Sequence, residues 1–599
     1  MNEPTFTYRG HLLRGNKKNE IPSRFVVFDT EGFTRIDDRG RVTLSPFLWC
    51  ASYYRIGGKA IPAPDTQPNQ SAWSTVIPEL WDFITGRAHA GTRLWVFAHN
   101  LAVDFAPTLG FGELSKRGWT IARMVAHDRL ATITYRKGEA TIVFSNTGSI
   151  FPGSIKLWGY ALGLPKLPQP DYNDHVARWV EYCQRDVAIL ARMLLTWFKF
   201  LRDHDLGNFQ PTIAGQAFNA FRHRFMTHKI TIHDEPDVIE LERQAYHGGR
   251  IEALKTGDFT HEQFYLVDVR SMYPTIMRDR EVPVELRGYQ TRLPVEALNP
   301  LLERYAVIAE CEIYPSEPAC PRMNNDKTVY DEMPRVAVLA TPELQYAAAK
   351  GWINKVGRVA WYKKGYALRA YAEYFMALRH QYEAENNIPY TLMAKLLANS
   401  LYGKFGQYGH LDLIAKDAPP DLVASEEHWL SQKQTWVTLL AYGGHWHMIR
   451  KTPRAYNAFI AIAAHITAYG RMQMWHMMRA ADISNVYHVA VDSMIVSRTG
   501  YERLVAAGFI GEQPGQARIE RIATTLTVRA PNDLRIGDAE RIKGVSDKDE
   551  QIDAHTYRQM WWRSLHSIVS EGEHDVVAKI VVKHLERARY RALKEREER

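Results

Sequence analysis

The alternation of apolar and polar positions divides the first third of the chain into strand-like and helical segments. Residues 25–28 and 94–98 are continuous apolar runs, the pattern expected of buried parallel strands. Between Val176 and Phe200 the apolar residues recur at helical spacing, which predicts one long helix over residues 180–197. Strands followed by a long helix indicate an α/β domain of about 190 residues.

The rest of the chain predicts a second group of elements. Residues 264–267 are strand-like, and residues 366–401 have the spacing of a helical block. Two strand-like runs over residues 436–449 enclose Gly443-Gly444, which predicts a β-hairpin. A further strand-like run covers residues 486–496. These elements indicate a chain of several domains.

Composition agrees with a folded protein that has a polyanionic partner. The 599 residues are 46% hydrophobic, which excludes global disorder, and carry a formal charge of +8. Neither a long apolar run nor a signal-like start is present, so we expect no membrane partner. Residues 579–599 hold eight Lys or Arg against four Glu and predict a basic helix. The four cysteines lack metal-ligand spacing and are expected to be reduced thiols.

A first set of acids begins at the end of the first predicted strand. Asp29 and Glu31 lie two apart, so an extended backbone points both side chains to one face. Asp104 follows the second strand, and Tyr182 and Asp186 share a face of the predicted helix. Hydrolysis of a phosphodiester by two metal ions needs such hard oxygen ligands. A single Asp-x-Glu after a strand is common, and the weight lies in the ordered combination.

In this order the first set resembles the DEDD-type proofreading exonucleases in their tyrosine-bearing form. The resemblance implies that Asp29, Glu31, Asp104 and Asp186 bind Mg²⁺, with Mn²⁺ as a second possibility, and that Tyr182 orients the attacking water. It also implies that Asn100 contacts single-stranded DNA. Val103 stands where the family's second motif is usually aromatic, which we expect to alter packing rather than metal binding.

A second set of motifs lies in the later region of the chain. The run Asp268-Val269-Arg270-Ser271-Met272-Tyr273-Pro274 follows the strand over residues 264–267, and Lys395-Leu396-Leu397-Ala398-Asn399-Ser400-Leu401-Tyr402-Gly403 lies in the helical block. Asp492 follows an apolar strand. On a helix Lys395, Asn399 and Tyr402 share one face. Together these runs resemble the polymerase motifs of family B DNA polymerases.

This second resemblance implies a two-metal nucleotidyl-transfer site. Asp268, Val269 and Asp492 would hold the metals. The residues expected to contact the incoming deoxynucleotide are Tyr273, Arg379, Lys395, Asn399 and Tyr402. Arg379 is also placed to form a surface ion pair with Glu383. Ala490 departs from the family, whose third motif is Asp-Thr-Asp, and we expect it to weaken metal affinity or change metal preference.

Three further runs resemble the protein-primed subgroup of bacteriophages, linear plasmids and related mobile elements. They are Tyr246-His247-Gly248-Gly249, Thr467-Ala468-Tyr469-Gly470-Arg471 and Ser154-Ile155-Lys156-Leu157-Trp158. The resemblance implies that DNA is bound by Tyr246, Gly248, Gly249, Thr467, Gly470, Arg471 and Ser154. The subgroup's Lys-x-Tyr run is replaced by Asn532-Asp533-Leu534, and Arg535 and Lys543 are the substitutes we expect on the primer phosphates. Each run also has an ordinary structural interpretation, such as a turn at Gly-Gly or an amphipathic strand over 154–158.

The resemblance implies an α/β multidomain fold, in which a ribonuclease H-like exonuclease domain precedes a right-hand polymerase with two insertions. The expected divisions are exonuclease domain 1–190, first part of the palm 191–278, priming-protein insertion 279–360, fingers 361–410, second insertion 411–455, second part of the palm 456–545 and thumb 546–599. We expect a monomer in the cytoplasm of a bacterial host. Its expected partners are primer-template DNA, single-stranded DNA, deoxynucleotides and a terminal protein.

Other functions remain open from the sequence. A family B polymerase that uses a nucleic-acid primer, or starts without one, would carry the same motifs. Ala490 leaves room for a DNA-binding protein with a degraded polymerase site. A stand-alone nuclease is a further alternative, against which the complete motif over residues 395–403 argues.

Overall fold

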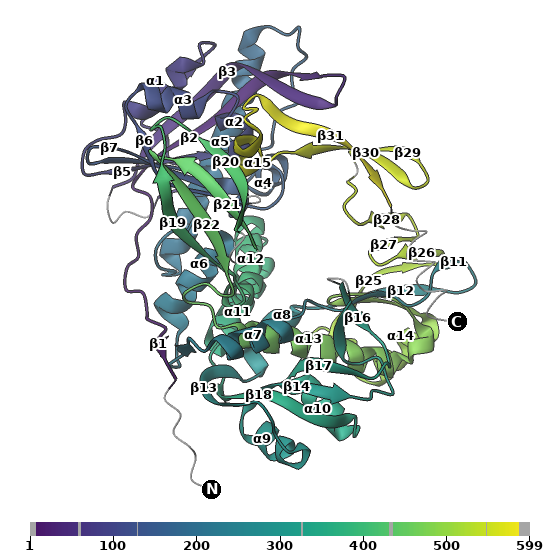
Figure 1. Cartoon of the computed structure of the whole chain (residues 1–599). Coiled ribbons are helices and arrows are strands. Elements are labelled where there is room, and N and C mark those ends of the chain that lie inside the picture. The colour runs from purple at the N-terminus through teal and green to yellow at the C-terminus, as the bar shows by residue number, and fades with distance from the viewer. Residues whose placement is uncertain are drawn as a thin grey trace.

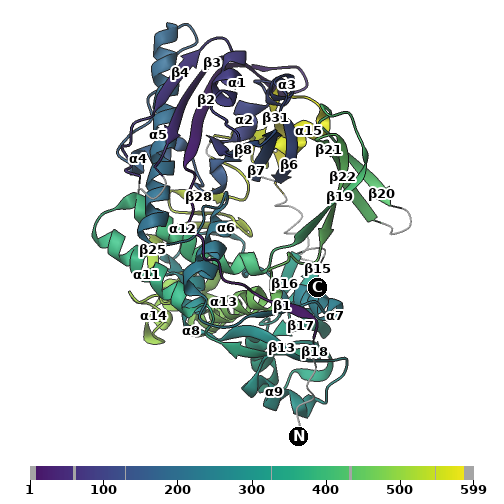
Figure 2. The same cartoon turned by 90° about the vertical axis from the view of Figure 1, so that its left-hand side faces the viewer.

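The computed structural model describes residues 8–57, 62–127, 130–324, 327–430, 435–546 and 548–585. Its elements are arranged as a ring in Figure 1, and Figure 2 shows the same ring from the side. Within the described residues no helix is both long and apolar enough to cross a membrane.

The N-terminal domain is built on a mixed sheet. Strand β2 (Arg24–Ile36) pairs parallel to β5 (Arg93–Ala98), which pairs parallel to β8 (Ala140–Asn146), and β3 (Arg41–Arg55) lies antiparallel on the other side of β2. Helix α5 (Val176–Asp203) packs on β2 and β3 and buries Trp197, Phe198 and Phe200. The predicted strands and long helix are therefore confirmed, and α5 continues without a break past residue 190.

The central sheet has the strand order β10-β23-β24-β12-β25. Its strands are β10 (Ile251–Ala253), β12 (Phe264–Val269), β23 (Val486–Ala490), β24 (Ser493–Ser497) and β25 (Ala517–Ala523). The strand-like run over 486–496 is thus two strands joined by a turn, where Val491 has a φ of 64°. Helices α8 (Met272–Asp279) and α13 (Ile460–Ala481) pack against each other beside this sheet.

The helical block predicted over residues 366–401 is two packed helices, α11 (Arg369–Ala384) and α12 (Ile388–Phe405). The break follows from local chemistry. Asn386 has a φ of 54°, and the Asn387 side chain accepts a hydrogen bond from the Tyr390 N–H at 3.3 Å. Pro389 lies in the first turn of α12, where its missing N–H costs nothing.

Two sheets occupy the places where insertions are expected. The first has the order β13-β18-β14-β17, with β13 (Val282–Gln290), β14 (Ala306–Ile313), β17 (Arg335–Ala340) and β18 (Ile353–Gly365), and α10 (Thr341–Ala349) packs beside it. The second has the order β19-β22-β21-β20, with β19 (Gly409–Asp417), β20 (Ala424–Leu430), β21 (Thr435–Tyr442) and β22 (His445–Thr452). The predicted hairpin is confirmed as β21 and β22, with positive φ at Gly443 and Gly444.

The C-terminal segment (residues 550–584) follows a small sheet that contains β26 (Leu526–Ala530), β27 (Asp533–Ile536) and β28 (Ala539–Ile542). It consists of β29 (Glu550–Asp553), β30 (Thr556–Trp562), α15 (Leu565–Glu571) and β31 (Val576–His584). The predicted basic helix is wrong where it can be compared, because residues 579–584 belong to β31. Its β-branched residues Ile580, Val581 and Val582 favour a strand. Residues 586–599 of that prediction lie outside the described residues.

Candidate active sites

The first candidate site lies at the end of β12 in the central sheet. Asp268 is the register partner of Ser493 on β24, so Asp492, the preceding residue, lies beside it. The Val269 N–H donates to the Asp492 carbonyl at 2.8 Å, and the Asp492 N–H donates to the Ala490 carbonyl at 2.8 Å. The two predicted metal-binding acids, 224 positions apart in the chain, are brought together by the pairing of β12 with β24.

Electrostatics at this edge favour a bound cation. Burial raises the pKa of Asp268 to about 7, with further increases from Asp492 and Glu520. Burial also raises the pKa of Asp492, and Glu520 adds to it. Lys395 lowers the pKa of both acids. Carboxylates whose pKa values are raised in this way suit a divalent metal, because the bound ion would favour their charged forms.

Glu520 was not predicted from the sequence. It lies on β25, which pairs with β12 so that Arg518 is the register partner of Asp268, and the register shifts between Leu266 and Val267. No motif surrounds Glu520, and only the pairing of β12 with β25 could reveal it. It lines a cavity of about 530 Å³ together with Ala490, Ser493 and Arg518. An acid from another strand of the sheet, Glu520, therefore lines the same cavity as Ala490.

The predicted nucleotide contacts gather around these acids. On α12 the side chains of Lys395 and Asn399 are exposed, and the Asn399 amide donates to the Lys395 carbonyl at 2.9 Å. Tyr402 packs on Tyr273 with ring centroids 4.7 Å apart. Arg379 bonds to the Ser271 hydroxyl at 3.3 Å and forms an ion pair with Glu383 at 2.7 Å. The ion pair with Glu383 is therefore confirmed, and the contact of Arg379 with the triphosphate stays a prediction.

The segment from Tyr246 to Gly249 borders the same site. A Cβ on Gly249 would lie 2.8 Å from Val491 Cγ1 and 3.2 Å from the Tyr273 hydroxyl, so only glycine fits there. Gly248 is exposed and Tyr246 is half-buried. The segment therefore places its backbone directly against the turn that carries Asp492.

The prediction that Thr467 and Arg471 contact DNA directly is wrong in this structure. Arg471 is 1% exposed and forms an ion pair with Glu343 of α10 at 2.7 Å. It also donates to the carbonyls of His247 and Gly248 at 2.8 and 3.0 Å. Thr467 is buried and bonds within its own helix. Gly470 packs on Tyr273, where a Cβ would lie 3.2 Å from Cε1. This motif positions the segment 246–249 from inside the protein.

The second candidate site lies in the N-terminal domain. Asp29 and Glu31 come from β2, Asp104 from α2 (Leu101–Phe105) and Asp186 from α5. Thr30 fixes Asp104, since its N–H and hydroxyl donate to Asp104 Oδ1 at 3.1 and 2.7 Å. The structure therefore brings together all four acids of the first predicted set, with Tyr182 one helical turn from Asp186.

The environment of these acids also disfavours their charged forms. Burial raises the pKa of Glu31 to about 8 and that of Asp104 to about 7, and Asp186 raises both further. Burial and the neighbouring acids raise the pKa of Asp29 well above its usual range. Asp186 Oδ1 is buried and, within the described part of the chain, has no hydrogen-bond partner. A pair of hard divalent ions such as Mg²⁺ fits this donor set.

Two residues of this site were missed by sequence reasoning. Lys166 forms an ion pair with Asp186, and its ammonium group lies 4.3 Å from the ring centroid of Tyr182. It comes from the irregular segment between α4 (Ile155–Ala161) and α5, where no periodicity marks it. Cys183 offers its sulfur within 4.8 Å of ligand atoms of Asp29 and Glu31. All four cysteines are free thiols, as predicted.

Three further residues that are predicted to contact DNA are exposed: Asn100, Ser154 and Lys543. Asn100 is exposed with a φ of 72°, and its N–H donates to Asn146 Oδ1 at 3.0 Å. Ser154 caps α4 by accepting from the Leu157 N–H at 3.3 Å, so the run 154–158 is the start of a helix rather than a strand. Lys543 is exposed in a turn, and its carbonyl accepts from Lys583 Nζ at 2.8 Å.

Comparison with known proteins finds relatives for part of this chain. The model of DNA polymerase type B, organellar and viral, matches residues 166–414, which include Asp268 and the run 395–403. A DNA-directed DNA polymerase of Enterobacteria phage PRD1 is 24% identical over 246 residues, covering 40% of this chain and 40% of its own length. Residues 166–414 of this chain therefore resemble the type B DNA polymerases.

Further relatives are also named as DNA polymerases. A probable DNA polymerase of Neurospora intermedia is 21% identical over 343 residues, which is 53% of this chain and 33% of that protein. The matches thus span a third to two fifths of the curated relatives' lengths. Phi29 DNA polymerase, solved with primer-template DNA and incoming nucleotides, superposes with a TM-score of 0.67 at 15% identity over 94% of this chain and all of that one. The same polymerase solved with single-stranded DNA gives a TM-score of 0.61. The expected α/β multidomain fold is therefore confirmed.

Proposed function

We propose that this protein is a DNA-directed DNA polymerase that also carries a separate 3′→5′ exonuclease site. The observation that carries the first part is the position of Asp268 and Asp492 on paired strand ends, with Lys395 near enough to lower the pKa of both. The relatives named as DNA polymerases and the type B match over residues 166–414 support this assignment.

In the polymerase reaction Asp268, Asp492 and the Val269 carbonyl would hold the metals. Bound Mg²⁺ supplies a lower pKa for the primer 3′-hydroxyl and neutralises charge on the triphosphate. Lys395 and Arg379 bind the triphosphate, and Asn399 faces the base. Tyr273, held by Tyr402, lies under the sugar and leaves no room for a 2′-hydroxyl. These residues contribute positioning and electrostatic stabilisation of the transition state.

At the second site the four acids would hold the metals for hydrolysis of the 3′-terminal phosphodiester. Tyr182 orients the attacking water. The ammonium group of Lys166, next to Asp186 and Tyr182, lies where negative charge develops on the phosphate. Asn100 and Ser154 stand on the exposed rim and contact the single strand. We assign proofreading to this site.

We also propose that synthesis starts from a terminal protein and displaces the second DNA strand. The sheet β13-β18-β14-β17 is the expected site of the priming protein, and the sheet β19-β22-β21-β20 that of strand separation. The fold shared with Phi29 DNA polymerase supports both insertions. Within this proposal Lys543 contacts the primer, and the protein works as a monomer in the cytoplasm of a bacterial host.

Ala490 gives one observation in favour of a different function, a DNA-binding protein with a degraded polymerase site. Glu520 argues against this function, because its carboxylate lines the same cavity as Ala490. Both functions predict DNA binding, and only the polymerase predicts extension.

The test is extension and shortening of a labelled primer on a longer template, with Mg²⁺ or Mn²⁺, with and without deoxynucleotides. We expect Asp492→Asn to lose extension alone and Asp29→Asn to lose shortening alone. Asp538→Asn, which changes an acid whose side chain is 89% exposed, serves as the matched control and should keep both activities. A wild-type protein that binds the primer-template but never extends it would favour the degraded site. Synthesis that starts equally well without a terminal protein would remove the priming proposal alone.

A further inference from the structure

Cys183 places a sulfur atom among the acids of the second candidate site. It lies on α5, three residues before Asp186, so both side chains point to the same side of the helix. Its thiol contacts the Asp29 carbonyl at 3.5 Å and Asp29 Oδ2 at 3.8 Å. The four-acid arrangement proposed above gives this sulfur no role.

The sulfur and two carboxylates converge closely enough to hold one ion. Ligand atoms of Asp29, Glu31 and Cys183 all lie within 4.8 Å of one another. A tetrahedral ion with metal–sulfur and metal–oxygen distances of roughly 2.3 and 2.1 Å holds its sulfur and oxygen ligands roughly 3.6 Å apart. The 3.8 Å between Cys183 Sγ and Asp29 Oδ2 is close to this value. The fold therefore already holds this pair near the spacing that one shared ion requires.

Asp186 supplies a further oxygen beside these ligands. The residue is 3% exposed, and Oδ2 forms an ion pair with Lys166. Oδ1 is buried and has no hydrogen-bond partner among the residues that the structure describes. Asp186 raises the pKa of both Asp29 and Glu31, so it lies near both acids. An unsatisfied buried carboxylate oxygen is costly, and an ion shared with the other three ligands would satisfy it.

The surroundings of Cys183 differ from those of an ordinary core cysteine. A buried cysteine usually behaves as a small apolar side chain. Cys311 fits this description, since it is fully buried on β14 of the first inserted sheet. Cys183 is equally buried, but its sulfur lies against a carbonyl and a carboxylate oxygen. In the described part of the chain no other group of three or more His, Cys, Asp or Glu converges as closely as Asp29, Glu31 and Cys183.

A sulfur ligand changes which ions this donor set prefers. Mg²⁺ selects hard oxygen ligands, so an arrangement built on the four acids leaves the thiol aside. Zn²⁺ and the softer Cd²⁺ bind thiolate strongly. When such an ion binds, a metal–sulfur bond replaces the sulfur–hydrogen bond, and the proton leaves to solvent.

We propose that Asp29, Glu31, Cys183 and Asp186 form a site for one thiophilic divalent ion of the zinc and cadmium class. The ion bound to the sulfur occupies carboxylates that the two-metal Mg²⁺ arrangement needs, so it blocks hydrolysis. At the polymerase site none of the described residues that line the cavity is a cysteine, so extension continues. The block of hydrolysis rests on the proposed exonuclease function, whereas binding of the ion does not.

Cadmium binding tests the site directly. Cd²⁺ is added to protein that has been freed of metal with a chelator and dialysed, and the ultraviolet charge-transfer absorption of a cadmium–thiolate bond is recorded. We expect one band that saturates at one ion per chain and is absent from Cys183→Ala. Asp29→Asn should raise the Cd²⁺ concentration at half-saturation by roughly ten- to hundredfold, because loss of even a residue that supports metal ligands has this effect.

Cys311→Ala is the matched control, because it removes an equally buried thiol from another part of the fold. This variant should keep the band at full height. Cys183→Ser covers the case in which Cys183→Ala fails to fold, since serine keeps a donor toward the Asp29 carbonyl and removes only the sulfur. No band in the unmodified protein, or a band of full height in a folded Cys183 variant, would overturn the proposal.

Primer shortening and primer extension give a second readout. Both are measured in excess Mg²⁺ with increasing Cd²⁺, and each rate is divided by the rate of the same variant in Mg²⁺ alone. In the unmodified protein shortening should fall at Cd²⁺ concentrations roughly tenfold or more below those that slow extension, and Cys183→Ser should remove this difference. Equal sensitivity of the two reactions in the unmodified protein would contradict the block of hydrolysis.

The two readouts separate the ion site from the proposed function. Unmodified protein that shows the cadmium band but never shortens a primer in Mg²⁺ would refute the exonuclease function and support the ion site. Shortening in Mg²⁺ without a cadmium band would support the exonuclease function and overturn the ion site.

Discussion

At the scale of single residues, both candidate sites consist of acids that the fold holds in an unfavourable environment. Burial raises the pKa of Asp268 and Asp104 to about 7 and that of Glu31 to about 8. Such acids weaken the folded state at neutral pH, and they are retained because a bound cation uses their charge. Lys166 lies beside Asp186 in one site, and Lys395, Arg518 and Arg541 lower the pKa of acids in the other.

The pH dependence of stability follows from these acids. Their folded-state pKa values are raised, so between about pH 4 and pH 8 the folded state binds more protons than the unfolded state, and the free energy of unfolding falls as pH rises. We expect Asp29→Asn, measured with a chelator, to melt higher than the unmodified protein at pH 8 but not at pH 5. A change of 1 kcal/mol corresponds to about 2–4 °C for a domain of this size.

Differential scanning calorimetry in EDTA at both pH values would measure this effect. Asp538→Asn, on the exposed surface, should show no difference between the two pH values beyond that of the unmodified protein. A lower melting temperature for Asp29→Asn at pH 8 would mean that the acids stabilise the metal-free protein, contrary to the shifts above.

Position 490 gives a second prediction at this scale. Ala490→Asp adds a carboxylate to the cavity that Glu520 lines, beside Asp268 and Asp492. Bound Mg²⁺ should raise the melting temperature. We expect the Mg²⁺ concentration at half of this rise to fall roughly tenfold, because residues that support metal ligands change metal affinity by this order. The control is Ala539→Asp, which lines the same cavity from β28. An unchanged midpoint for Ala490→Asp would show that Glu520 already fills the role of the missing acid.

At the scale of elements, α10 and α13 are joined by one buried ion pair. Arg471 and Glu343 are 1% and 0% exposed, and the Ala340 N–H also donates to Glu343 at 3.2 Å. Since Arg471 also holds the carbonyls of His247 and Gly248, the first inserted sheet and the segment 246–249 are positioned together. This arrangement explains why a motif expected on the DNA surface is found inside.

Removal of either partner should leave a buried charge without its counter-charge. We expect Arg471→Ala to lower the free energy of unfolding by about 3–5 kcal/mol, and Glu343→Ala to act similarly. The double variant should lose much less than the sum of the two. Urea unfolding of all four proteins measures this coupling. The exposed pair Arg498–Glu502 is the reference and should show about 0.3–0.5 kcal/mol. Strict additivity for Arg471 and Glu343 would contradict a functional ion pair.

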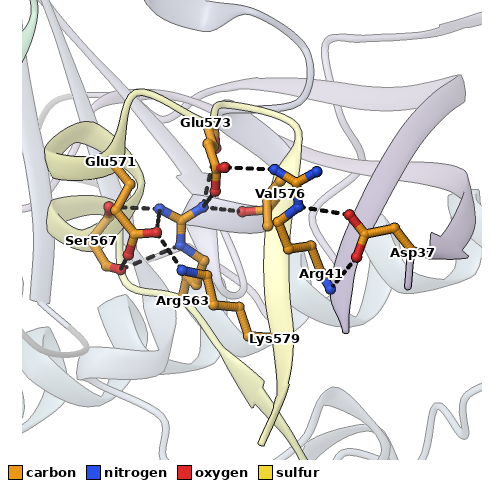
Figure 3. A network of polar contacts seen from close by, with 8 residues as sticks. All are labelled: Asp37, Arg41, Arg563, Ser567, Glu571, Glu573, Val576 and Lys579. Atoms are coloured by element: carbon orange, nitrogen blue, oxygen red, sulfur yellow. Dashed lines mark hydrogen bonds and ion pairs between the residues drawn. The ribbon is translucent and has the colours of Figure 1, made fainter. Parts of the chain in front are cut away.

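At the scale of the whole molecule, α15 and β31 form a joint between the end of the described chain and the N-terminal domain (Figure 3). The largest buried cluster runs from the N-terminal domain through the central sheet to α11 and α12, whereas α15 packs in a separate cluster with the N-terminal domain and β21. The joint can therefore open without disturbing the larger core. Stability of this kind is local and is measured by hydrogen exchange.

Arg563→Ala tests this independence. The substitution leaves the acceptors at Ser567 and Val576 without their donor, and we expect faster amide exchange in α15, β31 and β3. Exchange in β12 and β24 should stay as in the unmodified protein. Arg498→Ala is the matched control on the surface. Equal acceleration in the central sheet would mean that the joint and the core open as a single unit.

The sequence by itself determined the local elements and the motif residues that lie within them. The strands over 25–28 and 94–98, the long helix and the Gly443-Gly444 hairpin follow from periodicity and turn chemistry, which act over a few residues. The acids Asp29, Asp104, Asp268 and Asp492 could be named because each follows an apolar strand or lies in a recognisable run. The helical block is divided at Asn387, two residues before Pro389. The apolar residues keep their helical spacing across this break, so periodicity alone predicts a single block.

Only the tertiary structure decided which distant residues share a site. Glu520 and Lys166 stand in no motif and reach their acids through strand pairing and loop packing. The motif predicts that Arg471 contacts DNA, because the sequence does not show that Glu343 lies opposite it. The charges of residues 579–584 predict a basic helix, but these residues belong to a strand that pairs with β3. The physical reason is the same throughout: periodicity reports how a segment is exposed, whereas the identity of the segment that covers it depends on contacts between distant parts of the chain.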